Sequence, residues 1–383
     1  MDTYPFAGYF HVHSAVRDST ELFTRSDSTV YRKICENLRG QILSGKFAPG
    51  TRLPSVRELA ATWGSSVFTI QTALKELVNQ GWIDRRHGSG TFIADPKSRF
   101  LDVGIYYGGD FRTNTTTGFI RNLHFSMLDQ LQRLKKRAHV FIDHRPDYKQ
   151  KSVMPAVMEA IAERRIQALI SPSINHFNCR DLAELALPTA FISNPFSSKN
   201  TDFNTEQLFR EGVRQLSAQG CRSVGLISNI WLPDSETPAE QDYSKSHYDY
   251  FRQAAAAEGV ATKEEWILQP SEFVHDLEKH GYDEMKRMLR LREKPDGIIV
   301  LPDMVAIGVV IAVLELGRQM ARKPMKFVFH RNAHIRLLCP FPVTWAISDE
   351  DVLAQGLIRM LQRQFDAKKV SPSRLPYIFK QGS

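Results

Sequence analysis

The sequence predicts an α/β protein: a helix-turn-helix with a β-wing, followed by a two-lobed domain of doubly wound parallel sheets. Two observations predict this fold. Three short helical patterns and a glycine hairpin come first. From residue 101 onward, apolar strand-like segments alternate with helical patterns, as in parallel sheets covered by helices on both faces. We expect a flexible arm (1–28), the winged helix-turn-helix domain (29–94), a linker (95–100) and the two-lobed domain (101–383).

Composition excludes several classes of protein. The chain has 383 residues, of which 42% are hydrophobic and 24% charged, as in globular proteins of two or three domains. Its four cysteines lie far apart without CxxC spacing, which argues against a disulfide framework and a structural zinc site and favours the reducing cytoplasm. The N-terminus MDTYPFAGYF lacks the features of a signal peptide. The most apolar run, residues 298–317, is broken by Pro302 and Asp303, so a strand and helix are expected there rather than a membrane span.

Positive charge gathers near the N-terminus. Lys and Arg number 50 against 42 Asp and Glu, giving a net charge of +8. Residues 28–99 hold 11 of these basic residues and 5 acidic ones, a net of +6. Such a footprint fits a nucleic-acid partner for this part of the chain.

The first helix is expected at residues 30–44, where Ile34, Leu38 and Ile42 recur at four-residue spacing. The segment GKFAPGTRLP then turns the chain through two glycines and two prolines.

Two further helices are expected at residues 56–63 and 66–80. Ser55 begins the first of them, with Glu58 three residues later as in a capping box. Ser66 opens the next, which turns Ile70, Leu74, Leu77 and Val78 inward. Two short strands, 83–86 and 91–93, then flank HGSG, so the pattern predicts a helix-turn-helix followed by a β-wing.

The stretch ILSGKFAPGTRLPSVRELAATWGSSVFTIQTALKELVNQGWIDRRHGSGTF closely resembles the winged-helix domain of the GntR family of bacterial transcription regulators. The shared motifs are PG-x-x-LPS-x-REL, T-x-x-x-AL-x-x-L and G-x-I-x-RR-x-G-x-GTF, and the match covers residues 31–93. The resemblance implies that the third helix enters the DNA major groove and that the wing tip enters the minor groove.

Candidate DNA-binding residues follow from these positions. Arg85 and Arg86 supply charge at the wing, and its glycines permit positive φ and close approach to phosphates. A solvated hairpin with incidental cations is the alternative. The full set comprises Arg57, Ser65, Ser66, Thr69, Gln71, Thr72, Lys75, Arg85, Arg86, His87, Gly88 and Gly90.

The third helix departs from the family where common members carry Arg and this chain has Val67 and Gln71. Glutamine can bond adenine through two hydrogen bonds, whereas arginine favours guanine. The operator of a typical relative therefore does not transfer to this chain. A merely solvated Gln71 is the alternative, and for Val67 packing and contact with a thymine methyl remain equally open.

In the larger part, strands are expected at LDVGIYY, HVFIDH, ALISPS, TAFISN, SVGLIS, GIIVLP and KFVFH. Scattered segments, including KPDGIIVLPDMVAIGVVIAVLELG and QLFREGVRQLSAQGCRSVGLIS, resemble the periplasmic-binding-protein-like sensor of the LacI family. This combination resembles regulators of sugar metabolism such as the arabinose repressor group. The long connection SNIWLPDSETPAEQDYSK is expected to be a mobile rim or a partner surface.

The LacI-like resemblance implies a ligand between two lobes, at loops beyond the strand ends. The ligand-binding candidates are Asp110, Phe119, Ser171, Ser173, Asn194, Asn229, His247, Asp303 and Arg331, with Gly108 and Ser193 beside them.

Several of these candidates have simpler interpretations. Phe119 is equally compatible with the core, Asp303 with a helix cap, and His247 with a solvent-facing substitute for the family's Arg. Arg331 stands where the family usually has Asp. It indicates either an anionic ligand or an Arg331–Asp303 pair across an unused pocket.

The favoured function is a cytoplasmic, homodimeric repressor whose affinity for operator DNA is controlled by a small ligand, a sugar or sugar derivative. No cofactor, metal site or catalytic residue is predicted, because no Ser/His/Asp signature, HExxH, P-loop or GxGxxG after a strand occurs. The alternatives are a carbohydrate enzyme with an accessory winged helix and a DNA-binding protein with a degenerate sensor.

Overall fold

The structure is a computed structural model. It describes residues 25–44, 46–79, 81–86, 88–94, 101–110, 118–146, 149–173, 178–229, 238–271, 274–320 and 324–382. The chain divides into two compact units, Met1–Arg99 and Phe100–Ser383.

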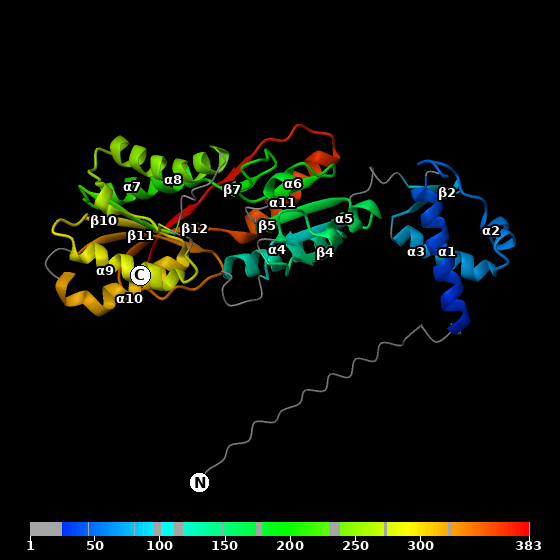
Figure 1. The fold of residues 1–383 in the computed structure, drawn as a ribbon, viewed down its shortest axis with the longest axis horizontal. Helices are drawn as coiled ribbons and strands as arrows, with labels where there is room; N and C mark the ends of the chain where they lie inside the picture. The colour runs from blue at the N-terminus through cyan, green and yellow to red at the C-terminus, as the bar shows by residue number, and fades with distance from the viewer. Residues whose placement is uncertain are drawn as a thin grey trace, which may run out of the picture. The chain divides into compact units, whose positions relative to one another are not determined.

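The first unit is a winged helix-turn-helix (Figure 1). Its elements are α1 (Arg25–Leu43), α2 (Val56–Thr62), α3 (Val67–Asn79), β1 (Ile83–Arg86) and β2 (Gly90–Ile93). The two strands pair antiparallel from Ile83↔Ile93 to Arg86↔Gly90. The expected order of helices and wing is therefore confirmed.

The core of this unit follows the predicted periodicity. Ile34, Leu38 and Ile42 of α1 are buried against Ile70 and Leu74 of α3. These side chains sit one helical turn apart, so each helix presents one apolar stripe.

The helix ends also follow the predicted signals. The capping box at α2 is present: Glu58 N donates to Ser55 Oγ over 3.3 Å, and Ser55 N donates to Glu58 Oε2 over 2.7 Å. At the other end of the unit, α1 begins at Arg25, inside the segment expected to be a flexible arm. Residues 1–24 lie outside the described part of the chain.

Lobe 1 of the second unit contains a parallel sheet in the order β4-β3-β5-β6. Helices α4 and α11 pack together on it, and their apolar residues share one core. Its elements are β3 (Asp102–Tyr107), α4 (Gly118–Arg133), β4 (Arg137–Ile142), α5 (Pro155–Ala162), β5 (Ala168–Ser173), α6 (Cys179–Ala183), β6 (Thr189–Phe191) and α11 (Glu350–Phe365).

Lobe 2 contains a six-stranded sheet in the order β14-β12-β11-β10-β8-β9, parallel except for β14. Its elements are α7 (Thr205–Ala218), β8 (Val224–Ser228), α8 (Pro238–Ala257), η2 (Glu264–Trp266), β9 (Ile267–Leu268), α9 (Leu277–Arg290), β10 (Gly297–Leu301), α10 (Asp303–Met320), β11 (Lys326–Asn332), β12 (Val343–Ser348) and β14 (Ile378–Gly382). Helices α7 and α8 cover one face and α9 and α10 the other, as Figure 1 shows.

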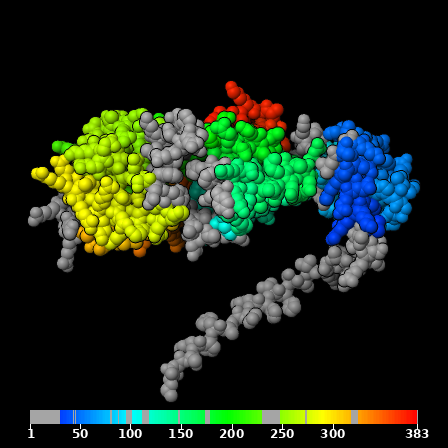
Figure 2. Space-filling view, in the orientation of Figure 1, coloured from blue at the N-terminus to red at the C-terminus, as the bar shows by residue number. Residues whose placement is uncertain are grey.

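The chain passes between the lobes more than once. Strand β7 (Thr201–Phe203) pairs in parallel with β13 (Ser373–Leu375), and the red C-terminal segment then continues into β14 of lobe 2 (Figure 1). In Figure 2 the cyan and green atoms of lobe 1 and the yellow atoms of lobe 2 form two distinct masses. This architecture confirms the predicted two-lobed, doubly wound fold.

Some local predictions were wrong. Helix α8 begins at Pro238, so the second half of the segment expected to be a long connection is helical, while residues 230–237 lie outside the described residues. The short strands β7 and β9 and the edge strand β14 were not predicted, because two to five residues carry too little periodicity.

The four cysteines are buried, and none of them forms a disulfide bond. Within the described residues, no helix combines the length and the apolar character needed to cross a membrane.

Helices α9 and α10 approach each other closely through two glycines. A Cβ at Gly308 would lie 1.9 Å from the Glu278 backbone oxygen, and one at Gly281 would lie 2.1 Å from the Val305 backbone oxygen. Both obstacles are backbone atoms of the facing helix, so they cannot move aside as a side chain could. These two positions therefore set the spacing of the helix pair.

We predict that Gly308→Ala lowers the free energy of unfolding of the second unit by about 3 kcal/mol, since overpacking forces the helices apart. Urea unfolding followed by circular dichroism measures the change. Gly109→Ala, where no atom lies within 4 Å of the added Cβ, is the control and should change stability by less than about 0.5 kcal/mol. Equal effects of the two substitutions would contradict the prediction.

Candidate functional site

The candidate nucleic-acid interface is the exposed face formed by α2, the start of α3 and the wing. Arg57 on α2 and Ser66, Gln71 and Lys75 around α3 are exposed, whereas Ser65 and Thr72 are partly buried. Thr72 Oγ1 donates to the Phe68 carbonyl oxygen over 3.0 Å, so its hydroxyl proton is already used within the helix. Polar groups thus line the helix face that is predicted to meet base edges.

Thr69 is a correction to the predicted set. Its side chain is 5% exposed, and its hydroxyl lies 2.8 Å from Ser66 Oγ. Ser66 Oγ also accepts from Thr69 N over 3.0 Å, which caps the first turn of α3. Thr69 therefore faces the core and holds the helix start instead of offering its side chain to DNA.

Sequence reasoning overlooked two residues of this face. Phe68 is 58% exposed at the start of α3, beside Val67 at 44%. Arg52 is exposed and forms an isolated antiparallel bridge with Phe92 of β2, so it lies next to the wing. In the sequence Arg52 lies between two prolines, in the turn segment PGTRLP, which shows neither helical nor strand periodicity.

The wing carries its cations outward. Arg85 and Arg86 are exposed, and the Arg86 guanidinium carbon lies 4.5 Å from the centre of the Phe92 ring. Gly88 and Gly90 have φ of 71° and 115°, values that L side chains rarely adopt. A Cβ at Gly90 would also lie 2.8 Å from Arg52 Nε, so this glycine makes room for a third cation. His87 lies outside the described residues.

The second candidate site is a cavity of about 430 Å³ between the lobes. It opens at the carboxyl ends of the lobe 2 strands, where ligands of such sheets bind. Its described lining comprises Phe119, Ile192, Ser193, Asp202, Phe203, Thr205, Asn229, Pro302, Asp303, His330, Asn332, Ser348, Leu353 and Tyr377. The lining combines aromatic faces with convergent polar groups, as in small-molecule sites.

A chain of buried hydrogen bonds forms the lobe 2 side of the cavity. Asn332 Nδ2 donates to Asp303 Oδ2 over 2.9 Å, and Ser348 Oγ donates to Asn332 Oδ1 over 2.7 Å. His330 Nε2 lies 2.9 Å from Ser348 Oγ. All four side chains are at most 9% exposed, so each bond offsets a desolvation cost.

The distance between Ser348 Oγ and His330 Nε2 is typical of a nucleophile and its base, but the direction of the hydrogen bond between them is not. The single hydroxyl proton of Ser348 is donated to Asn332, so His330 Nε2 must be the donor toward Ser348 Oγ. A general base has to accept the nucleophile's proton. This pair therefore cannot work as a catalytic dyad in the arrangement observed.

The structure brings only part of the predicted ligand set to the cavity. Phe119, Asn229 and Asp303 line it, together with Ser193. The described candidates absent from the lining are Asp110, Ser171, Asn194 and His247, and also Arg331. The side chain of Ser173 lies outside the described residues.

Asn194 is a correction with a clear physical reason. It is fully buried, its Nδ2 donates to the Cys179 carbonyl oxygen over 2.9 Å, and its Oδ1 accepts from Phe196 N over 3.0 Å. Both ends of the amide are thus committed to fixing the loop after β6. Ser171 is likewise fully buried, on β5.

Asp110 and His247 lie at other places. Asp110 Oδ2 is 4.0 Å from His144 Nδ1 at the end of lobe 1 strands, and His247 is a partly buried residue of α8.

Arg331 is the most informative correction. Strand β11 continues through Asn332, and side chains alternate along a strand, so Arg331 points away from the face that carries His330 and Asn332. Its guanidinium carbon lies 5.4 Å from the centre of the Trp345 ring. Among the described residues Arg331 neither pairs with Asp303 nor lines the cavity, so the structure supports neither of the two proposed roles.

Asp303 lies both at a helix start and at the cavity. It is 1% exposed at the first position of α10, where its Oδ1 accepts from Met304 N over 3.0 Å. Its Oδ2 accepts from Asn332, and the residue lines the cavity. It is thus held at the helix start and presented to the cavity at once.

Two groups in the cavity have shifted pKa values. Burial raises the pKa of Asp202 to about 6, although Ser193 N and Oγ donate to its Oδ1 over 2.7 and 2.9 Å and oppose the shift. Burial lowers the pKa of His330 to about 4, against the attraction of the nearby Asp303 charge. His330 is therefore neutral at physiological pH.

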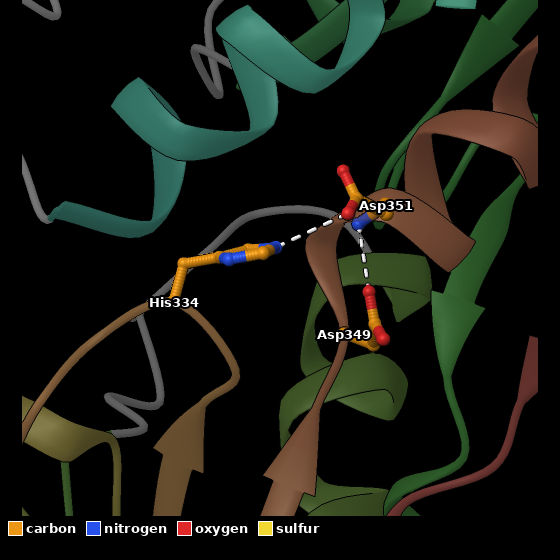
Figure 3. Close-up of side chains that lie close together, drawn as sticks. All are labelled: His334, Asp349 and Asp351. Atoms are coloured by element: carbon orange, nitrogen blue, oxygen red, sulfur yellow. Dashed lines mark hydrogen bonds and ion pairs between the residues drawn. The ribbon is translucent and has the colours of Figure 1, made fainter.

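His334, Asp349 and Asp351 lie close together where lobe 2 meets α11, and Figure 3 shows the His334 ring directed at Asp351. Their ligand-type atoms lie within 4.8 Å of one another, the only such group in the described part of the chain.

Each member of this group already has a structural partner. Asp349 Oδ1 caps α11 at Asp351 N, Asp351 Oδ1 accepts from Ser126, and Asp351 Oδ2 lies 3.2 Å from His334 Nε2. The group therefore links a lobe 2 loop to lobe 1.

Comparison with known proteins agrees with both halves of the architecture. Residues 30–93 match the family of bacterial regulatory proteins called gntR, and residues 213–380 match the periplasmic-binding-protein-like domain. The chain thus joins a segment that matches the gntR family to one that matches the periplasmic-binding-protein-like domain. The resemblances read from the sequence are thereby confirmed.

The similar curated proteins match only part of this chain. The repressor NagR of Bacillus subtilis is 33% identical over 29% of this chain and 46% of its own length. The arabinose metabolism transcriptional repressor of Halalkalibacterium halodurans is 37% identical over 20% of each chain. The chain thus covers less than half the length of either relative.

The body has the fold of solved LacI-type regulators. The Cra regulator of Pseudomonas putida, solved with fructose 1-phosphate, superposes over 74% of this chain and 99% of its own with a TM-score of 0.53 and 15% identity. At that identity the likeness establishes the fold alone.

We predict a specific pH signature for His330. Its pKa is lower in the folded chain than the ordinary value of 6.5, so the unfolded chain binds an extra proton between pH 6.5 and 4. The contribution of neutral His330 to stability is complete above pH 6.5 and is lost as the pH falls toward 4, by up to about 1.4 kcal/mol per pH unit.

Urea unfolding of the wild type and of His330→Phe across this range tests the signature. The difference between their free energies of unfolding should be flat above pH 6.5 and shift against the wild type below it. A difference that is independent of pH would contradict the prediction.

Proposed function

We propose that this protein is a transcription regulator that binds operator DNA through its N-terminal unit and is controlled by a small ligand held between the lobes of its second unit. One observation carries the proposal: a single chain combines an exposed polar and cationic face on α3 and the wing with a polar cavity at the carboxyl ends of parallel strands. We further propose that it is a repressor and acts in the cytoplasm.

The DNA-binding role rests on the disposition of charge. Arg57 and Lys75 flank the exposed start of α3, and Arg85 and Arg86 stand at the wing with Arg52 beside them. Such cations bind phosphates in any sequence, whereas Gln71 can read a base edge. The remaining described members of the predicted set, apart from Thr69, keep this proposed role.

A sugar or sugar derivative is the proposed ligand. Phe119, Phe203 and Tyr377 offer ring faces to the cavity, and carboxylates and amides offer partners for hydroxyl groups. The relative from Halalkalibacterium halodurans acts on arabinose metabolism, and the Cra structure holds a sugar phosphate, so related domains serve carbohydrate regulation.

The proposed assembly is a homodimer, because two identical heads on a two-fold axis match a palindromic operator. Large apolar side chains stand exposed on α4 and α10: Phe125 at 62%, Ile311 at 50% and Leu314 at 57%. A second copy of the body would cover them. Closure of the lobes around a ligand would then change the separation of the heads and so their affinity for DNA.

We predict that binding to the DNA upstream of the protein's own gene falls steeply with salt, since several cations displace counterions. Arg85→Ala should weaken binding to operator and random DNA alike and reduce the salt slope by about 1. Gln71→Ala should cost about 1–3 kcal/mol at one operator base pair and little on random DNA.

Fluorescence anisotropy against ionic strength, with a randomised site library, makes these measurements. Thr69→Ser is a matched control, because it keeps the hydroxyl group that lies next to Ser66 Oγ. Equal affinity of the wild type for operator and random DNA would overturn the regulator proposal.

For the cavity, we predict that Asp303→Ala abolishes thermal stabilisation of the second unit by an effector sugar while operator binding persists. Asp303 lines the cavity with a buried carboxylate, whereas the DNA-binding residues belong to the other unit. Arg331→Ala is the matched control on β11 and should respond to the sugar like the wild type. Differential scanning fluorimetry over a sugar panel gives the result, and an unchanged response of Asp303→Ala would remove Asp303 from the binding site.

A further inference from the structure

The hydrogen-bond chain beside the cavity fixes which nitrogen of His330 carries its proton. The Asp303 carboxylate can only accept, so the Asn332 amide must direct its nitrogen there and its oxygen toward Ser348. Ser348 then spends its one proton on Asn332, and its oxygen is left to accept from His330 Nε2. The direction of each hydrogen bond is thus set from Asp303 through Asn332 and Ser348 to the imidazole.

His330 therefore keeps an unprotonated Nδ1. Its low pKa leaves the ring with a single proton, which is on Nε2. The Nδ1 atom is buried and has no hydrogen-bond partner among the described residues, and the residue, 9% exposed, lines the cavity. A buried acceptor without a partner is destabilising, so a donor supplied by a ligand would offset that cost.

Two acidic residues of the lining are acceptors as well, beside the hydroxyl and amide groups of Ser193, Thr205, Asn229 and Tyr377. Asp202 and Asp303 present carboxylates, which only accept when ionised. The described lining residues include no Lys or Arg that could receive an anion. Convergent acceptors from β7, α10 and β11 therefore meet one cavity, and they repel any group that is itself an acceptor bearing negative charge.

We propose that His330 is a specificity-determining residue whose Nδ1 accepts a hydrogen bond from the effector, and that the part of the effector reaching Asp303 and His330 carries hydroxyl or ammonium groups and no carboxylate or phosphate. This inference rests on the proposed regulator function and narrows its ligand class. It opposes the anionic ligand that the sequence position of Arg331 suggested.

The protonation state can be measured without any ligand. In a spectrum correlating imidazole nitrogens with ring protons, an Nε2–H tautomer is distinguished from Nδ1–H by which nitrogen is unprotonated. The signal of His330 is assigned by its loss in His330→Phe, which keeps an aromatic ring beside Tyr377. An Nδ1–H tautomer in the wild type would overturn the inference.

The ligand class is tested with matched probes: glucose, glucosamine, glucuronate and glucose 6-phosphate, and the same four forms of galactose. Thermal stabilisation and affinity are measured for the wild type, His330→Phe and Arg331→Gln. We expect neutral or amino members of a set to stabilise the wild type, and the acid and phosphate forms to fail. The glucose and glucosamine arms separate hydroxyl from ammonium recognition.

The affinity of the best probe should fall about tenfold in His330→Phe, the scale of one hydrogen bond to a buried group, and stay unchanged in Arg331→Gln. Preferential stabilisation by an anionic member, or by no member, overturns this inference. Neither result touches the regulator proposal, which fails only if the wild type lacks specific operator binding.

Discussion

The chain of buried hydrogen bonds from Asp303 to His330 is the constraint on which the second unit depends for its site. A buried carboxylate is tolerable only when its oxygens are bonded, and here Met304 N and Asn332 satisfy them. The same bonds dictate the orientation of the Asn332 amide and the Ser348 hydroxyl. Four residues from three neighbouring elements thus form one polar unit at the strand ends.

Several side-chain contacts join the two lobes beside this polar unit, and a change in the shape of the cavity could be transmitted through them. The loop after β11 reaches lobe 1 through His334 and Asp351, and Ile335 lies within 3.0 Å of the Cβ position at Gly118. Helix α11 leaves lobe 2 immediately after Ser348 and packs against α4. Ser348, a member of the hydrogen-bond chain, is therefore two residues from the start of the helix that carries the polypeptide into lobe 1.

The two units differ in where they place their charged and polar groups. The first exposes cations and a glycine wing, and its core of aliphatic side chains only supports that surface. In the second unit, polar groups line a cavity. There the proposed ligand would be selected by hydrogen bonds of fixed direction and not by net charge. Electrostatic attraction suits a polyanion of any sequence, whereas fixed donors and acceptors suit a small molecule of one shape.

The sequence by itself determined the order of the elements, the winged helix and the two-lobed sheets, because helical periodicity, the Ser55–Glu58 cap and the wing glycines are local signals. It also predicted roles for Arg57, Gln71 and Asp303. The structure shows the first two exposed and the third lining the cavity, and their roles stay predictions. Thr69 was placed in the DNA-facing set, but its side chain is buried. Adjacent residues at a helix start point in different directions, so the sequence alone did not show that Thr69 faces the core.

Only the tertiary structure decided which residues meet at the cavity. His330, Asn332 and Ser348 belong to two parallel strands whose register, Asn332↔Ser348, places them side by side. Side chains alternate between the two faces of β11, so Arg331, one residue away, points to the opposite face. The prediction therefore chose the correct strand but a side chain on the other face. The strand end could be read from apolar runs, but the face could not, because it depends on pairing between segments far apart in the chain.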